Sequence, residues 1–185
     1  MSKQRPVVAV LVGSLRKGSF NRQLARALGE IAGERADLRH IRIDDLPLYN
    51  QDFDGDYPAV CKRLKDEIKQ ADAVLFVTPE YNRSIPGVLK NAIDIASRPW
   101  GTNSFAGKPG AVIGTSMGAI STALAQQHLR NVCVFLDIPM LQQPEAFVRY
   151  QEGLIADDGS VTDESVANFL GNFVDKYLEW VGRFV

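Results

Sequence analysis

Short apolar runs alternate with longer segments of helical periodicity along the whole chain. The most uniform runs are 7–12 (VVAVLV), 73–77 (AVLFV) and 110–115 (GAVIGT). A continuous apolar run of this length predicts a strand that is buried on both faces. A weaker alternation over 38–43 predicts another strand, and the apolar segment 135–140 predicts a last one.

The segments between these runs have apolar residues three to four positions apart, the spacing of an amphipathic helix. The predicted helices cover residues 20–33, 58–71, 87–96, 119–133 and 164–181. Strands that alternate with helices of this length predict a parallel α/β sheet with helices on both faces. Right-handed crossovers then favour a doubly wound topology. With no repeat, linker or low-complexity tract, we expect a single domain over 1–185.

Such a sheet also predicts where a ligand binds. Ligands of open parallel sheets bind outside the carboxyl ends of the strands, where the strand order reverses. The loops that follow the three most buried strands are 13–21, 78–86 and 115–119, and all three are polar or rich in glycine. We therefore expect these loops to form the site together.

The first loop, GSLRKGSFN over 13–21, lies between a strand and a helix. The start of a helix has unpaired N–H groups and the positive end of the helix dipole, so it attracts anions. Ser14, Ser19 and Asn21 add hydrogen-bond donors, and Arg16 and Lys17 add positive charge. This set suits a phosphate monoester. The alternative is a polar turn in which Ser19 is an ordinary N-cap.

Two common phosphate motifs are excluded in this loop. Gly13 and Gly18 have the spacing of a P-loop, but Ser19-Phe20 stands where that motif requires Lys followed by Ser or Thr. The dinucleotide fingerprint also fails, because Leu15 and Arg16 occupy its glycine region. A terminal phosphate held by hydroxyl groups remains.

The second loop, TPEYNRSIPG, contains features that suit a flat ring. Pro79 and Pro86 fix the backbone at its two ends. Tyr81 can face an aromatic ring or cover its edge, and Asn82 can hydrogen-bond to it. The alternative is a rigid surface loop in which the tyrosine has no ligand.

The combination of GSLRKGSFN, TPEYN followed by IPG and LKNAID, and TSMG resembles the NADPH-dependent FMN reductase family. Within that family the chain is most similar to the bacterial chromate and quinone reductases. The resemblance runs from residue 7 to about residue 147 and implies a flavodoxin-like, five-stranded parallel sheet in the order 2-1-3-4-5. It further implies bound FMN, NADPH or NADH as the electron donor, and reduction of quinones and other small acceptors by a ping-pong hydride transfer. Those other acceptors are azo and nitro compounds, free flavin and chromate.

The resemblance also implies residue roles, all of them in binding FMN and none catalytic, because the flavin itself transfers the hydride. The phosphate would be enclosed by Ser14, Arg16, Ser19, Phe20 and Asn21, the isoalloxazine by Pro79, Glu80, Tyr81 and Asn82, and its pyrimidine side or ribityl chain by Ser116, Met117 and Gly118. Arg16 or Lys17 is also a candidate partner for the 2′-phosphate of NADPH.

The resemblance bears on assembly as well. Some relatives use an Arg and a Tyr of the helix after the third loop at a subunit contact, and Leu124 and Gln127 stand at those places here. Their acidic partner is present as Glu145. We therefore expect a homodimer, with a homotetramer as the less favoured alternative.

Charge and composition exclude several other classes of function. The formal net charge is −1 with both signs interspersed, so we expect neither nucleic acid nor a membrane as a partner. The same balance disfavours the alternative function, a flavodoxin-type electron carrier, because such carriers are strongly acidic. The polar start over 1–6 and the short run after it resemble no signal peptide, so we expect a cytoplasmic protein. We expect no metal site, because the two histidines and two cysteines are scattered, and we expect both cysteines to be buried.

Overall fold

The computed structural model of the chain describes residues 5–185. Within them, five parallel strands form one sheet in the order β2-β1-β3-β4-β5. The strands are β1 (Val7–Val12), β2 (Asp37–His40), β3 (Ala73–Val77), β4 (Gly110–Ser116) and β5 (Phe147–Arg149). This is the flavodoxin-like order expected from the sequence, so that prediction is confirmed. The expectation that the polar start and the run after it are no signal peptide falls partly on residues 1–4, which lie outside the described residues.

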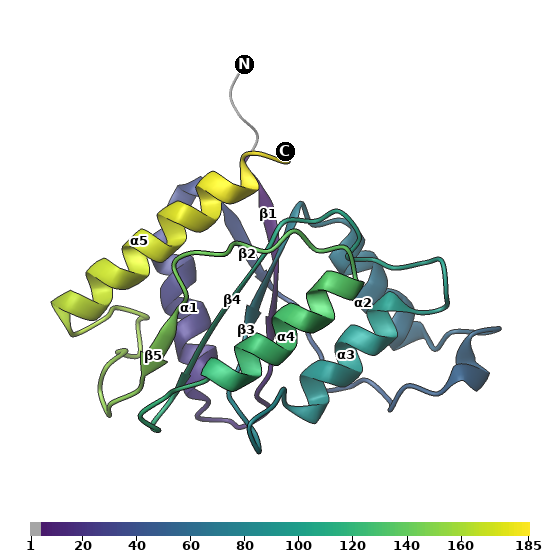
Figure 1. Cartoon of the computed structure of the whole chain (residues 1–185), viewed down its shortest axis with the longest axis horizontal. Coiled ribbons are helices and arrows are strands. Elements are labelled where there is room, and N and C mark those ends of the chain that lie inside the picture. The colour runs from purple at the N-terminus through teal and green to yellow at the C-terminus, as the bar shows by residue number, and fades with distance from the viewer. Residues whose placement is uncertain (1–4) are drawn as a thin grey trace.

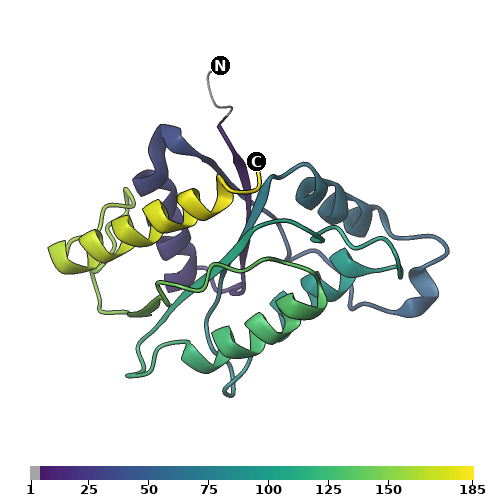
Figure 2. The same ribbon diagram turned by 45° about the horizontal axis from the view of Figure 1, so that its top comes forward.

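Helices cover both faces of the sheet, as Figures 1 and 2 show. One face carries α1 (Phe20–Ala32) and α5 (Glu164–Val181), and the other carries α2 (Ala59–Lys69), α3 (Gly87–Ser97) and α4 (Ala123–Phe135). Two short 3-10 helices, η1 (Gly33–Arg35) and η2 (Gln51–Phe53), lie in the connections.

Strand β1 shows how one sheet builds two cores. Val8 and Val10 pack on the α1 and α5 side, while Ala9 and Leu11 pack on the side of α2, α3 and α4. All four are fully buried. Successive side chains of a strand point to opposite faces, so a strand between two helical layers must be apolar at every position.

Helix α4 begins at Ala123, four residues later than the sequence predicts. A turn delays it: Ser121 has a φ of 51°, in the left-handed region, and its N–H donates to the carbonyl of Gly118 at 3.0 Å. A non-glycine residue in that region cannot continue a right-handed helix. The turn extends the third loop over residues 117–122.

The prediction of a last strand over 135–140 is wrong. Phe135 ends α4, and of the segment that follows only Met140 forms a parallel bridge, with Gly110 at the start of β4. The fifth strand is Phe147–Arg149 instead, paired with the end of β4. Ile138 and Met140 are apolar because they pack in the core on the side of α2, α3 and α4. The burial of these side chains explains the apolar pattern of the segment, although it forms no strand.

Candidate functional site

The carboxyl ends of β1, β3 and β4 bring the three expected loops together, and hydrogen bonds fix them to one another. The N–H of Gly13 donates to the carbonyl of Val77 at 2.9 Å. The side-chain amide of Asn21 is buried and forms two bonds with Thr115, donating to its carbonyl at 2.9 Å and accepting from its N–H at 3.0 Å. The first loop is therefore tied to β3 and to β4.

This contact gives Asn21 a different role from the one expected. Both polar atoms of its amide are used on the backbone of Thr115. The side chain therefore holds the first loop on β4, while the backbone N–H of Asn21, in the first turn of α1, can face a ligand. The sequence could not show this because the two residues are 94 positions apart.

The first loop has the geometry of an anion site at a helix start. Ser19 is the N-cap of α1, and its side-chain oxygen accepts from the N–H of Arg22 at 3.3 Å. Ser14 and Ser19 are both buried, whereas Arg16 and Lys17 are exposed. The N-cap interpretation of Ser19 is thus correct, and it leaves the N–H groups of the first turn directed out of the helix end.

Phe20 and Arg16 form a stack on this loop. The ring of Phe20 lies on that of Tyr150, with 3.6 Å between centroids, and the Arg16 guanidinium carbon lies 4.3 Å from the centre of the Phe20 ring. The Tyr150 hydroxyl donates to Gln23 at 3.0 Å, which fixes the base of the stack. Sequence reasoning missed Tyr150, which lies just beyond β5 and has no motif to mark it.

The second loop presents Tyr81 on a tight hairpin. Tyr81 and Ser84 exchange backbone bonds of 3.1 and 2.9 Å, and Asn82 and Arg83 between them have φ values of 50° and 65°. Positive φ at both central residues is the geometry of a type I′ turn. The turn holds Tyr81 outward with 52% of its surface exposed. Pro79, at the base of the loop, is buried.

Glu80 lies between the second and third loops. One of its carboxylate oxygens accepts from the N–H groups of Leu124 and Ala125, at 3.0 and 3.1 Å, and the other lies 3.3 Å from Arg83. Its side chain is only 7% exposed. The carboxylate thus caps α4, and only the backbone of Glu80 remains for a ring.

Hydrogen bonds to Ser116 and Ser121 hold the third loop in a compact turn. The N–H of Gly118 donates to the Ser116 hydroxyl at 3.2 Å, and that hydroxyl donates to the carbonyl of Ser121 at 3.1 Å. Met117 is left 68% exposed at the tip, and Gly118 is exposed beside it. The expected contributors from this loop therefore lie at the surface.

Together the loops provide two kinds of surface. Exposed apolar side chains come from all three of them and from the start of α4: Leu15, Tyr81, Met117, Ile120 and Leu124. The serine hydroxyls and free N–H groups lie at the start of α1. A flat, largely apolar ring with a phosphate tail needs both, so the residues present fit FMN.

Other residues that the sequence singled out lie around this region. His128 is exposed and shares a 2.9 Å hydrogen bond with the hydroxyl of Ser84. Gln127 donates to Glu145 at 3.0 Å, so these two positions form a contact within the chain. Both cysteines are buried, as expected, and burial raises the pKa of Cys133 to about 12.

Neither a metal cluster nor a membrane-spanning helix is found in residues 5–185. They contain no group of three His, Cys, Asp or Glu side chains placed to hold a metal ion. In the same residues no helix combines the length and the apolar character needed to cross a bilayer.

Comparison with known proteins gives consistent matches. The family model described as NADPH-dependent FMN reductase matches residues 6–153. A 2-hydroxy-1,4-benzoquinone reductase of Burkholderia sp. is 53% identical over 174 residues, which cover 94% of this chain and 95% of that protein. A quinone reductase of Pseudomonas putida is 51% identical over 175 residues, covering 94% of both chains.

A solved structure agrees with these matches. The flavoenzyme FerB of Paracoccus denitrificans, an NAD(P)H:(acceptor) oxidoreductase, superposes with a TM-score of 0.94 at 50% identity, over 97% of this chain and 98% of that one. The family model covers most of the chain, and the loops it includes are those that meet at the carboxyl edge of the sheet. The chain is therefore a member of the NADPH-dependent FMN reductase family.

Proposed function

We propose that this protein catalyses the two-electron reduction of quinones by NAD(P)H: one hydride from the nicotinamide and one proton convert each quinone into a hydroquinone. As a member of its family it is an oxidoreductase that uses FMN and an NAD(P)H donor. The quinone acceptor is supported by relatives above 50% identity that are named quinone reductases. The observation that carries the proposal is the open apolar surface formed by the three loops beside a phosphate-type site.

FMN, when bound, would supply the hydride chemistry that links the nicotinamide to the acceptor. The protein residues bind and orient. We assign Ser14, Ser19 and the first N–H groups of α1 to the phosphate. Arg16 is held near it by its contact with Phe20.

On the ring side we assign the backbone of Pro79 and Glu80 and the side chains of Tyr81 and Asn82, with Ser116, Met117 and Gly118 opposite. The type I′ turn fixes where Tyr81 points, so the ring meets a preformed wall. Because the exposed side chains are apolar, they exclude water from one side of the reacting atoms.

The same open face would receive the nicotinamide and then the acceptor, one after the other. We therefore propose ping-pong kinetics and a broad acceptor range that includes azo and nitro compounds, free flavin and chromate. A surface built from exposed side chains such as Tyr81 and Met117 offers few directional contacts for selecting one acceptor. We also place the reaction in the cytoplasm, where the NAD(P)H pool is found.

We infer that the protein acts as a homodimer. An exposed aromatic and aliphatic cluster at the end of α4 supports a subunit contact: Trp100, Val134 and Phe135 are 76%, 80% and 70% exposed. Such patches mark interaction sites in soluble proteins. Light scattering of the purified protein tests the assembly state.

Steady-state kinetics of the FMN-loaded protein tests the proposed function. We expect NAD(P)H to be oxidised when benzoquinone is present, with parallel double-reciprocal lines as the quinone concentration is varied. No oxidation of either nicotinamide by fully loaded protein would overturn the proposal in favour of an electron carrier. Intersecting lines would overturn the ping-pong order only.

A second test separates the phosphate site from the ring site. The variant Ser14→Ala is expected to lower the affinity for FMN about tenfold, since hydrogen bonds to a charged group are worth about 1.5–3 kcal/mol. Its affinity for riboflavin, which has no phosphate, is the comparison. Ser97→Ala, at the last residue of α3, where the hydroxyl donates to the carbonyl of Asp94, is the matched control. An equal loss for both flavins would contradict the phosphate assignment.

A further inference from the structure

A single side-chain hydrogen bond joins the tip of the second loop to α4. The tip is the tight turn of residues 81–84, here named the Tyr81 turn. The hydroxyl of Ser84 lies 2.9 Å from Nδ1 of His128, an exposed residue of α4. Within residues 5–185 the other side-chain bond of the turn, from Arg83, stays inside the loop and goes to Glu80. The position of the tip therefore depends on the pair of Ser84 and His128.

This bond adds to the one that Glu80 forms at the base of the loop. Glu80 binds the N–H groups of Leu124 and Ala125, in the first turn of α4. His128 lies one helical turn after Leu124. Helical side chains lean back toward the start of their helix, so the ring of His128 lies over that same first turn. Helix α4 thus holds the second loop at two points, its base and its tip.

Ser84 passes this restraint to Tyr81 because the two residues lie directly opposite each other. Their backbones exchange hydrogen bonds of 3.1 and 2.9 Å as an antiparallel bridge. The side chains of such a pair lie on the same face, with Cβ atoms about 5 Å apart. A shift of Ser84 therefore moves Tyr81, whose exposed side chain is assigned to the wall of the site.

The backbone of the Tyr81 turn needs a restraint of this kind. Asn82 and Arg83 both have positive φ, which is unfavourable for residues other than glycine. Strained backbone persists only where the surrounding structure holds it in place. Residues 81–84 include no glycine that would adopt this conformation without strain. Loss of the bond to His128 should therefore let the turn relax, and Tyr81 with it.

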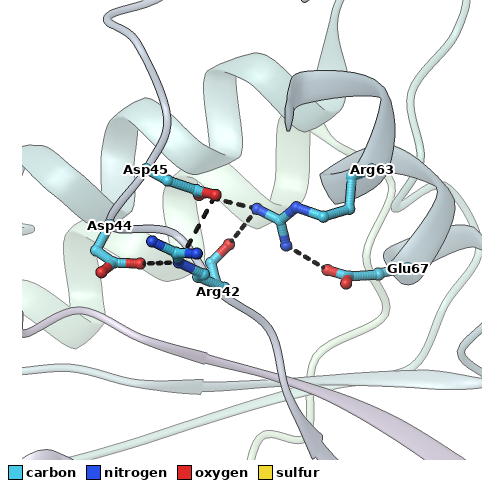
Figure 3. Close-up of polar contacts among 5 residues, drawn as sticks. All are labelled: Arg42, Asp44, Asp45, Arg63 and Glu67. Carbon is cyan, nitrogen blue, oxygen red and sulfur yellow. Dashed lines mark hydrogen bonds and ion pairs between the residues drawn. The ribbon is translucent and has the colours of Figure 1, made fainter. Parts of the chain in front are cut away.

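The segment after β2, at the same edge of the sheet, is held in a different way. Figure 3 shows Arg63 of α2 donating to Asp45 at 2.9 Å and to the backbone carbonyl of Arg42 at 3.0 Å. The same guanidinium donates to Glu67 at 2.9 Å. Loss of one of these partners leaves the others in place. The tip of the Tyr81 turn has one bond to a helix, so one substitution should free it.

We propose that His128 is a positioning residue for the quinone acceptor: through Ser84 it holds Tyr81 as a fixed wall against which a flat ring stacks. The inference rests on the proposed function, since it concerns the acceptor of that reaction. Aromatic rings attract one another in offset-stacked or edge-to-face arrangements. A wall that is already in place binds such a ring without the entropic cost of ordering the side chain.

The bond between Ser84 and His128 forms in either protonation state of the histidine. An unprotonated Nδ1 accepts from the Ser84 hydroxyl, and a protonated Nδ1 donates to it. Substitution of one of the two side chains is therefore the way to break the restraint.

Binding of 2-methyl-1,4-naphthoquinone to oxidised protein that is saturated with FMN tests the proposal without turnover. No nicotinamide is present, so the quinone binds and is not reduced, and titration calorimetry gives its affinity. We expect His128→Ala to weaken binding about three- to tenfold, the factor that one hydrogen bond contributes. We expect Ser84→Ala to weaken it by the same factor.

Three further variants separate the hydrogen bond from the loss of a side chain. In His128→Asn the amide lies where Nδ1 lay, so we expect the affinity to return to within about twofold of the wild type. In His128→Gln the amide lies one bond further out and should not restore the affinity. The double variant His128→Ala/Ser84→Ala should lose no more than either single variant, because each removes the same bond.

The matched control is Gln127→Ala. Gln127 is the neighbouring exposed residue of α4, and its 3.0 Å hydrogen bond goes to Glu145, which is not part of the second loop. We expect this variant to bind the quinone as the wild type does. Urea denaturation of every variant is the second readout. A loss of stability without a loss of quinone affinity would show a structural role only and would overturn the proposal.

Three other binding results would also overturn it. The first is a wild-type protein that does not bind the quinone, or a His128→Ala variant that binds it as well as the control does. The second is a failure of His128→Asn to restore the affinity. The third is an additive loss in the double variant, since the two side chains would then act separately.

Steady-state kinetics divides the effect between KM and kcat. We expect the KM for the quinone to rise with the loss of affinity and kcat to stay within about twofold, because His128 acts through Ser84 and touches no reacting atom. A fall in kcat at unchanged KM would overturn the positioning role. A protein that reduces quinones equally well with and without His128 keeps the proposed function and loses only this inference. A protein that oxidises neither nicotinamide loses the proposed function, and the binding measurement still decides whether His128 positions the wall.

Discussion

The carboxylate of Glu80 is expected to stabilise α4 and the site at the same time. The side chain that precedes this helix, Thr122, makes no cap bond, and its hydroxyl accepts from Gln126 at 2.9 Å instead. Glu80 takes over the role of the cap by accepting from the second and third N–H groups of the helix, at 3.0 and 3.1 Å. These are the groups that an N-cap residue normally satisfies.

The magnitude follows from these contacts. Loss of an N-cap acceptor costs about 0.5–2 kcal/mol, and a negative charge at a helix start adds about 0.3–1 kcal/mol. The side chain is nearly buried, but water can reach the exposed Leu124 and replace part of what is lost. We therefore expect Glu80→Ala to lower the free energy of unfolding by about 2 kcal/mol. Glu80→Gln keeps an acceptor oxygen and loses the charge, so we expect about 1 kcal/mol.

Urea denaturation of the FMN-free protein, followed by circular dichroism, measures both changes. The affinity for FMN is measured in parallel, because Glu80 joins the second loop to the start of α4, and its removal should weaken binding as well. The matched control is Glu145→Gln. That carboxylate accepts an exposed hydrogen bond from Gln127 beside the same helix, so its loss should cost less than about 0.5 kcal/mol. If Glu80→Ala were as stable as this control, the capping argument would be refuted.

Two further predictions concern packing and titration. Gly114→Ala would place a Cβ 2.1 Å from the carbonyl oxygen of Thr78 and 2.4 Å from the hydroxyl of Thr122, so we expect a loss of about 3 kcal/mol or a failure to fold. Gly171→Ala in α5, where nothing lies within 4 Å, should instead add up to about 1 kcal/mol in the same urea denaturation; comparable losses in both variants would contradict the contact argument. Burial raises the pKa of Cys133 from its ordinary 9.0 to about 12, so its stabilising contribution should be complete below pH 9 and lost between pH 9 and 12. Denaturation of wild type and Cys133→Ala across that range measures this, and parallel pH curves would contradict it.

The sequence alone determined that the sheet is parallel and which loops meet at its carboxyl edge. The runs 7–12 and 73–77 are apolar at every position because both faces of those strands are covered, which is a property that sequence can encode locally. Once the sheet is parallel, its carboxyl edge is the place where loops meet. The same logic failed at 135–140, because an apolar pattern records burial and does not say which backbone a segment pairs with.

The roles of individual polar side chains were decided by the tertiary structure. Asn21 and Glu80 belong to motifs that suggest ligand contacts, yet their side chains bind the backbone at Thr115 and at the start of α4. The pairing partners are 94 and 44 positions away, and no local pattern encodes such distances.

The hollow between the start of α1 and the segment after β2, whose wall includes Arg22, Arg26, His40 and Arg42, shows the same division most clearly. Arg22 and Arg26 are one helical turn apart on α1, so the sequence places them on one face of that helix. It gives no indication that the segment with His40 and Arg42 lies opposite them, because that proximity comes from the parallel pairing of β1 with β2. Sequence determined which charges exist and which helix carries them. Only the fold gathered them around one cavity, where their mutual repulsion favours an anion.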